Sequence, residues 1–341
     1  MKRLLQVMSG APVGGAETFF VRLVGALHRA GMPQRVVIRR DPARAAAIRA
    51  EGPEPAELAF GGRWDFLTRR RIAAIAADFE PDVALTWMNR ASGMTPPGPY
   101  VKIARLGGYY NLRYYRDCEH LVGNTAAICD YIRSHGWPAS RVHHLPNFVP
   151  APSAPPLPRS ALHTPAGVPL LLAMGRLHRN KAYDVLLQAL ARLGDTHLWL
   201  AGEGPEAAAL KALAGSLGIA DRVRFIGWRQ DGDALRAAAD VLVCPSRFEP
   251  LGNVVLEAWA ARLPVVAAAA AGPAALIRDG ENGLLVPPDD AAALATSLAR
   301  LTADAGLRAR LVEAGEADWR AGFTEQAVVA RYLALFDKVC R

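Results

Sequence analysis

The segment from residue 240 to residue 267 predicts a strand, a loop, a helix and the start of a second strand: DVLVCPSRFEPLGNVVLEAWAARLPVVA. An apolar run from Val241 to Val243 stops at a proline, which is typical of a buried parallel strand. The loop carries Glu249 and breaks at Gly252, and a helix with apolar residues at helical spacing follows until Pro264 ends it. Parallel strands joined by a helix indicate an α/β fold built on an open parallel sheet.

Two carboxylates of this segment fall where such a sheet binds ligands. Glu249 follows the strand, at the edge where helix N-termini direct free N–H groups outward, and Glu257 lies eight residues further on, inside the helix. Gly252 between them allows a backbone to approach an anionic ligand closely. Backbone amides donate hydrogen bonds to phosphates, and carboxylates accept them from hydroxyls. The pattern therefore favours a ligand that is part phosphate and part polyol. The alternative is that Glu249 is a solvated loop residue and Glu257 an exposed helix residue, with no ligand between them.

The wider context favours the binding site. Pro-Ser-x-x-Glu-Pro-x-Gly, then Leu-Glu-Ala-x-Ala and Leu-Pro-Val-Val, resembles the donor-site signature of glycosyltransferase family 4, the retaining enzymes of GT-B fold. The resemblance implies that Glu249 and Glu257 are the two glutamates of that signature. Upstream, Gly-Arg-Leu-x3-Lys-x2-Asp-x-Leu-Leu resembles the family's diphosphate clamp and implies Arg176 and Lys181 as its cations. Two cations beside a helix N-terminus suit a leaving diphosphate when no metal is bound.

Other donor and acceptor residues follow from the same resemblance. The Gly-rich loop SGAPVGGA resembles the family's first phosphate loop, although such turns also simply join packed elements. Besides Glu257, the implied donor-binding residues are Gly14, Gly15, Gly227, Trp228, Gly252, Asn253 and Gly272. Family relatives often carry a histidine near the end of the strand predicted at residues 102–106, and this chain has none there. The acceptor-side candidates are Asn89, Arg90, Arg105, Gly108 and Tyr109.

Length and a Pro-rich stretch indicate two domains. At ~150 residues per domain, 341 residues predict two, and PAPSAPPLP at residues 150–158 suits a semi-rigid connector. We predict an acceptor-binding domain at residues 1–150, a nucleotide-sugar-binding domain at 151–322, and a closing helix at 323–341 that crosses back to the first domain. The fold class implied by the resemblance is α/β, with two Rossmann-like doubly wound domains facing a central cleft.

The net charge of +8 lies in the first half of the chain. Residues 1–150 hold 20 Lys and Arg against 12 Asp and Glu, and the remaining residues hold 20 against 20. A helix is predicted at residues 64–79, and it carries Phe66 and the run Arg69–Arg71. These residues indicate either an ordinary solvated helix face or an amphipathic element that rests on an anionic membrane surface. We expect an anionic glycan or glycolipid acceptor, such as a lipopolysaccharide core, and a peripheral contact with the inner face of the cytoplasmic membrane. A GC-rich coding bias would also explain the charge, and no nucleic-acid-binding motif is present.

Metal sites, disulfides and targeting segments are not expected. The four cysteines have no CxxC spacing, and the apolar run in MKRLLQVMSG is too short for a signal peptide, so a cytoplasmic location is expected. Asp231-Gly-Asp233 resembles the metal motif of the other glycosyltransferase fold, but it opens a helix and is interpreted as capping. No metal or cofactor is therefore predicted, only a nucleotide-diphosphate sugar as donor substrate.

The function that the family resemblance implies is retaining sugar transfer to a glycan or glycolipid. Arg176 and Lys181 would stabilise the charge that develops on the diphosphate, while Glu249 holds sugar hydroxyls and Glu257 the ribose. The alternatives are a sugar-nucleotide epimerase of similar fold and a non-catalytic carbohydrate-binding relative. The complete clamp and the paired glutamates argue against both.

Overall fold

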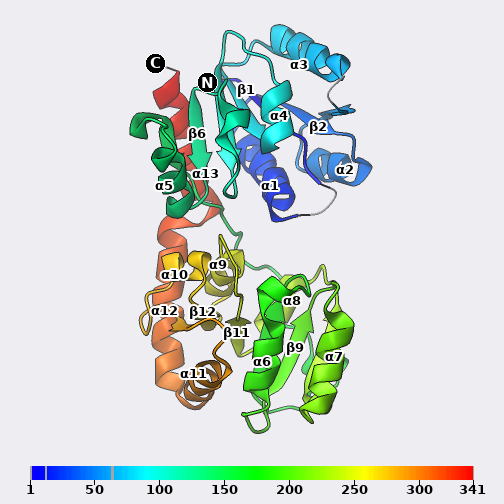
Figure 1. Cartoon of the computed structure of the whole chain (residues 1–341), viewed down its shortest axis with the longest axis vertical. Coiled ribbons are helices and arrows are strands. Elements are labelled where there is room, and N and C mark those ends of the chain that lie inside the picture. Colours follow the sequence, from blue (N-terminus) through cyan, green and yellow to red (C-terminus); the bar gives the residue numbers. More distant parts are fainter. Residues whose placement is uncertain (1, 12–13, 63–64, 341) are drawn as a thin grey trace. The chain divides into compact units, whose positions relative to one another are not determined.

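The computed structural model describes residues 2–11, 14–62 and 65–340, and these residues form two compact units. The N-terminal unit comprises Met1–Asn147 together with Glu325–Arg341, and the C-terminal unit comprises Phe148–Thr324. The chain therefore passes from one unit to the other twice, after Asn147 and after Thr324 (Figure 1). The Pro-rich stretch at residues 150–158 contains neither helix nor strand.

The N-terminal unit is built on a parallel sheet in the order β3-β2-β1-β4-β5-β6-β7. Its strands are β1 (Leu4–Met8), β2 (Gln34–Arg39), β3 (Pro55–Leu58), β4 (Val83–Trp87), β5 (Val101–Leu106), β6 (His120–Gly123) and β7 (Val142–His144). Its helices are α1 (Gly15–Arg29), α2 (Pro42–Ala50), α3 (Phe66–Phe79), α4 (Met88–Met94), α5 (Ala126–Ser134) and α13 (Glu325–Val339). The last helix, red in Figure 1, thus packs into the unit that begins the chain.

The C-terminal unit repeats this plan with the strand order β10-β9-β8-β11-β12-β13. Its strands are β8 (Leu170–Met174), β9 (His197–Ala201), β10 (Val223–Gly227), β11 (Val241–Cys244), β12 (Val265–Ala268) and β13 (Leu284–Val286). Its helices are α6 (Tyr183–Leu190), α7 (Ala207–Ser216), α8 (Gly232–Ala238), α9 (Asn253–Ala260), α10 (Ala271–Leu276), α11 (Ala291–Ala303) and α12 (Ala305–Gly322).

Helices cover both faces of the second sheet, which explains its strongly apolar strands. In β8, Leu171 packs with α6, α7 and α11, whereas Leu172 packs with α8 on the opposite face. Both side chains are fully buried, so the strand reads as a continuous apolar run rather than an alternating one. The prediction of two doubly wound, Rossmann-like domains is confirmed.

The strand order creates a topological switch point in each sheet. β8 pairs with β9 on one side and with β11 on the other, and β1 lies in the same way between β2 and β4. The connections leave such a central pair of strands in opposite directions, which opens a crevice at their carboxyl ends. The loops after β8 and β11, where the predicted clamp and glutamate lie, therefore meet at one place.

The sequence pattern does not predict every helix and strand. The short α2 and β3 and the long α12 were not predicted, because each of them buries few apolar residues. In α12 these are chiefly Leu307, Leu311 and Trp319 among many charged residues. Arg63 and Trp64, placed by prediction at the start of α3, lie outside the described residues. None of the helices in the described part of the chain is long and apolar enough to cross a bilayer.

Candidate functional site

The switch point of the C-terminal unit brings Lys181 and Glu249 together. Lys181 ends a 3-10 turn (Arg179–Lys181) between β8 and α6, and Glu249 lies in the loop after β11. Although 68 residues separate them, Lys181 Nζ donates a hydrogen bond to the Glu249 carboxylate. Their side chains are 24% and 12% exposed, so this ion pair is partly screened from water but open to a ligand. The structure thus unites two of the three predicted catalytic side chains.

The third, Arg176, lies two residues beyond the end of β8. Its side chain is exposed and makes no hydrogen bond or ion pair with any described residue. A guanidinium without a protein carboxylate keeps its full capacity to bind an oxyanion in a bidentate manner. Arg176 and Lys181 therefore place two cations on the connection that leaves β8.

The loop that carries Glu249 is held by backbone contacts with the start of α10. The Gly272 amide donates to the Glu249 carbonyl at 2.7 Å, and the Gly252 amide donates to the Glu249 carboxylate at 3.3 Å. A Cβ on Gly272 would lie 2.6 Å from both the Glu249 carbonyl oxygen and the Leu251 carbonyl carbon. Gly252 has φ 75°, a left-handed conformation suited to glycine, as N-cap of α9. Both predicted donor-site glycines thus shape the loop itself.

Glu257 has a different partner from Glu249. It lies in α9 and accepts from Arg236 Nη1 at 3.0 Å, while Arg236 Nη2 donates to Asp233 at 2.6 Å. Arg236 therefore holds a carboxylate from each of two helices at the carboxyl edge of the sheet. Sequence analysis missed Arg236, although its i,i+3 spacing from Asp233 is a recognisable ion-pair signal. Asn253 begins α9 and is half-buried.

The Asp231-Gly-Asp233 motif is neutralised by arginines. Asp231 pairs with Arg229 at 2.5 Å, and these hydrogen bonds lower the pKa of the Asp231 carboxyl. Asp231 occupies the N-cap position of α8 and Asp233 lies in its first turn, as the capping interpretation predicts, although the Asp231 side chain accepts no bond from a helix amide. The nearby arginine binds the carboxylate more strongly than a neutral amide would. Within the described ranges, no three His, Cys, Asp or Glu side chains gather as a metal-binding group.

Glycines bring the ends of β8, β9 and β10 into close contact. The Gly202 amide donates to the Gly227 carbonyl at 2.7 Å, and a Cβ on Gly202 would lie 1.9 Å from the Gly175 carbonyl oxygen. Gly202 therefore serves close packing at this edge. Trp228 follows at the end of β10 with 61% of its surface exposed, so its indole presents a free apolar face.

Arg247 anchors the start of the Glu249 loop, and sequence analysis gave it no role. Its guanidinium donates to both carboxylate oxygens of Asp184 in α6, at 2.9 and 2.7 Å, and also binds Asp289 and the Arg179 carbonyl. Burial opposes ionisation of Asp184, but the Arg247 hydrogen bonds outweigh it and lower the pKa of that carboxyl. The loops after β8 and β11 are thereby tied together beside the Lys181–Glu249 pair.

In the N-terminal unit, the Gly-rich loop folds around a carboxylate of its own. Gly14 is the N-cap of α1, Gly15 begins the helix, and Glu17 in the first turn is 7% exposed. Glu17 accepts from the Ala11 amide at 2.8 Å, and Arg44 donates to the Ala11 carbonyl. Residues 12 and 13 of this loop lie outside the described part. An acid in a first helical turn is favoured by the helix dipole, which is the signal that could have identified Glu17.

The acceptor-side candidates divide into engaged and open residues. Asn89 accepts from the Tyr115 hydroxyl, and Arg90 donates to the Phe60 carbonyl at 2.9 Å. Arg105 in β5 is buried, at 3% exposed, and its guanidinium is engaged by Tyr332 and Asn147. Gly108 is half-buried, and Tyr109 is 46% exposed.

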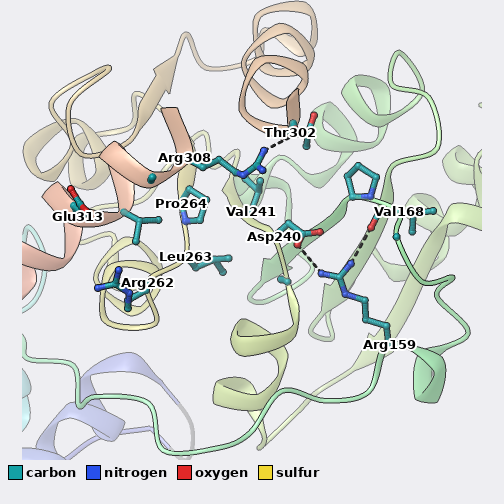
Figure 2. Close-up of a pocket in the computed structure, with 15 residues that line it drawn as sticks. Arg159, Val168, Asp240, Val241, Arg262, Leu263, Pro264, Thr302, Arg308 and Glu313 are labelled. Atoms are coloured by element: carbon teal, nitrogen blue, oxygen red, sulfur yellow. Dashed lines mark hydrogen bonds and ion pairs between the residues drawn. The ribbon is translucent and has the colours of Figure 1, made fainter. Parts of the chain in front are cut away.

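A cavity of about 640 Å³ in the C-terminal unit lies away from these residues. It is lined at the amino ends of β8, β11 and β12, the edge of the sheet opposite Lys181 and Glu249 (Figure 2). Two of its arginines have local partners: Arg159 binds Asp240 at 2.8 Å, and Arg308 donates to the Thr302 carbonyl at 2.7 Å. The cavity therefore adds nothing to the site at the switch point.

The fold and the paired site define the class of protein. Two doubly wound units, with cations and carboxylates gathered at the switch point of the second, make this chain a glycosyltransferase of GT-B fold. Residues 13–151 match the model Glycosyltransferase Family 4, and residues 168–304 match Glycosyl transferases group 1. The chain belongs to glycosyltransferase family 4, as predicted.

Similar proteins support this assignment over nearly the full length. The lipopolysaccharide core biosynthesis glycosyltransferase LpsE of Rhizobium meliloti is 39% identical over 331 residues, covering 94% of this chain and 95% of LpsE. LpsD of the same organism is 38% identical, covering 95% of each chain. The crystal structure of Anabaena HepE in complex with UDP superimposes with a TM-score of 0.86 at 22% identity, covering 99% of this chain and 100% of HepE.

Proposed function

We propose that this enzyme transfers a sugar from a nucleotide-diphosphate sugar to an anionic, lipid-linked glycan during lipopolysaccharide core synthesis, with retention of the anomeric configuration. The observation that carries the proposal is the Lys181–Glu249 pair at the switch point, beside an unpaired Arg176. The function printed for LpsE and LpsD supports the acceptor class, and the UDP bound to HepE supports a nucleotide donor.

The proposed chemistry uses the two cations as the leaving-group site. Arg176 and Lys181 bind the diphosphate, and their charge stabilises the electron pair that passes to it as the bond from the anomeric carbon to the phosphate oxygen breaks. The acceptor hydroxyl attacks from the same face and gives its proton to the departing phosphate oxygen. Glu249 then has a sugar hydroxyl as a partner besides Lys181, and Glu257 holds the ribose.

Mass spectrometry of donor hydrolysis across a panel of nucleotide sugars tests this proposal. Without acceptor, slow release of the nucleoside diphosphate and free sugar from one donor is expected. An epimerase would instead return an isomeric nucleotide sugar of unchanged mass, resolved by chromatography. A non-catalytic relative would bind a donor and leave it intact.

Activity should survive chelation, because Arg176 and Lys181 supply the charge that a metal supplies elsewhere. The carboxylates of Asp231 and Asp233 are engaged by arginines and offer a poor metal site. Initial rates measured with and without EDTA should agree within error. Complete loss in EDTA, with recovery on adding magnesium or manganese, would contradict the metal-free clamp.

The membrane contact is proposed for one face of α3. Phe66 and Leu67 are 63% and 74% exposed, and all three residues of Arg69–Arg71 are exposed, whereas Thr68 and Ile72 are buried. The apolar and cationic side chains therefore occupy the solvent side of one helix end. Such a face suits reversible adsorption to an anionic surface rather than insertion.

Replacing all three residues of Arg69–Arg71 by Ser should weaken sedimentation with anionic vesicles. Attraction of ~1 kcal/mol per basic residue predicts a loss of roughly a hundredfold in binding, and binding by the unchanged protein should fall as salt is raised. The matched control is Arg192, Arg300 and Arg310 changed to Ser, since these arginines are exposed on the C-terminal unit. Equal partition to neutral and anionic vesicles would contradict the proposal.

A further inference from the structure

The Glu257 side chain in α9 is held in place from a neighbouring helix. Leu256 and Ala258 on either side of it are buried, so the backbone here is fixed, whereas the Glu257 side chain is 21% exposed. Arg236 Nη1 in α8 donates to Glu257 Oε2 at 3.0 Å. The Arg236 side chain is only 11% exposed, so water competes weakly for this bond. A long side chain with several rotatable bonds is thereby restricted to one orientation.

A second carboxylate fixes Arg236 itself. Its Nη2 donates at 2.6 Å to Asp233, which lies three residues earlier in α8. A Cβ on Gly232 would lie 3.3 Å from Nη1 and 3.4 Å from Nη2, so the guanidinium lies close against the backbone of this glycine. Each end of the planar fork thus binds one carboxylate, a geometry that a lysine ammonium does not provide. The protein alone therefore determines where Arg236 lies.

One oxygen of Glu257 remains open to a ligand. Oε2 is occupied by Arg236, whereas Oε1 has no hydrogen-bond partner among the described residues. An ionised carboxylate only accepts hydrogen bonds, so the group that fits Oε1 is a donor such as a hydroxyl. Two carboxylates around one guanidinium also leave a net negative charge, which disfavours a phosphate at this place.

We propose that Arg236 is a positioning residue that orients Glu257 Oε1 toward a ribose hydroxyl, so that the site selects nucleotides that carry ribose hydroxyls. This inference rests on the proposed function, in which Glu257 holds the ribose of the donor. A hydroxyl gains more from a carboxylate that is already oriented, because the conformational entropy of the Glu257 side chain is lost in the free protein and not on binding. Arg236 therefore raises the affinity for ribose without contacting the nucleotide.

Nucleoside diphosphates test this role without any turnover. UDP, GDP, ADP and CDP are each titrated calorimetrically beside the 2′,3′-dideoxy counterpart, which lacks both ribose hydroxyls. The unchanged protein should bind the ribose form of its nucleotide about tenfold or more tightly than the dideoxy form, as expected for a hydrogen bond to a charged group. The ratio of the two affinities is the readout, because a change of charge near the diphosphate affects both forms alike.

Arg236→Met removes the fork and keeps an unbranched apolar stem. The ribose preference should fall below about threefold, because Glu257 is then free to turn away from the hydroxyl. Arg236→Lys keeps the charge and loses the fork, so it should show an intermediate preference, and it replaces Arg236→Met if that variant does not fold.

Arg159→Met is the matched control. Arg159 likewise pairs with a carboxylate of the C-terminal unit, Asp240 at 2.8 Å, but at the amino edge of the same sheet. Loss of this pair should lower the melting temperature and leave the ribose preference unchanged. The control thus separates a general loss of stability from a loss of positioning at Glu257.

An unchanged ribose preference in the folded Arg236 variant would assign Arg236 a purely structural role and overturn the inference. A larger preference would show that Arg236 competes with the ribose for Glu257, which also overturns it. Equal affinity of the unchanged protein for the ribose and dideoxy forms would exclude the ribose contact and leave the transfer reaction standing. Failure of the unchanged protein to bind any of the diphosphates would instead contradict the proposed nucleotide donor itself.

Discussion

Lys181→Ala should slow sugar transfer by about a hundredfold or more, the loss expected when a preorganised charge donor to a leaving group is removed. The change also deprives Glu249, 12% exposed, of its described cation. Single-turnover rates at saturating donor isolate the chemical step from donor binding. Arg176→Ala should cause a loss of similar size, because it removes the other cation of the clamp.

Arg179→Ala is the matched control for both clamp variants. Arg179 lies in the same short turn as Lys181, but its exposed side chain makes no described hydrogen bond or ion pair. It should retain transfer close to the unchanged rate. If Lys181→Ala and Arg176→Ala both keep full turnover and donor affinity, the clamp has been assigned to the wrong residues.

Gly272→Ala should lower kcat/KM by about a hundredfold while leaving a folded protein. The added methyl would meet backbone atoms of Glu249, Leu251 and Gly252 at 2.6–2.7 Å, closer than real Cβ contacts. The loop or α10 must therefore shift, and a displacement of about 1 Å at a catalytic group can cost that factor. Steady-state kinetics measure the loss in kcat/KM, and a far-UV circular dichroism spectrum shows whether the protein remains folded.

Gly215→Ala controls for the general effect of adding a methyl to a helical glycine. Gly215 lies in α7 with nothing within 4 Å of its would-be Cβ. It should raise the free energy of unfolding by roughly 0.5–1 kcal/mol and leave activity unchanged. Unaltered kinetics in Gly272→Ala would mean that the Glu249 loop tolerates displacement and is not part of the reacting site.

The fold could be predicted because its strands are buried on both faces. Continuous apolar runs such as Leu170–Met174, each followed by a Gly-containing turn and a helix, indicate parallel strands with little ambiguity. The long α12 could not be predicted, because it buries only a narrow stripe of side chains and exposes many charged ones. Likewise β3 is a four-residue strand of mixed polarity.

The site was predictable where local spacing carries the signal and not where distant residues meet. Lys181 and Glu249 each stand in a recognisable local pattern, and strand order then brings them together. The pairing of Arg236 with Glu257 and of Arg247 with Asp184 joins residues 21 and 63 positions apart, and no local pattern indicates these two contacts. The contacts of Arg105 with the rings of Phe19 and Trp87 likewise join residues far apart in the sequence, so no local pattern predicts them.

The reaction itself gives the most direct test. The enzyme is incubated in EDTA with a delipidated lipopolysaccharide core oligosaccharide and with the intact nucleotide sugar that the donor panel identifies. The product is followed by mass spectrometry and by proton NMR of its anomeric signal. We predict one sugar added to the oligosaccharide for each nucleoside diphosphate released, with the anomeric configuration of the donor retained. Consumption of the donor to an isomeric nucleotide sugar, or an inverted linkage in the product, would contradict retaining transfer by the Arg176–Lys181 clamp.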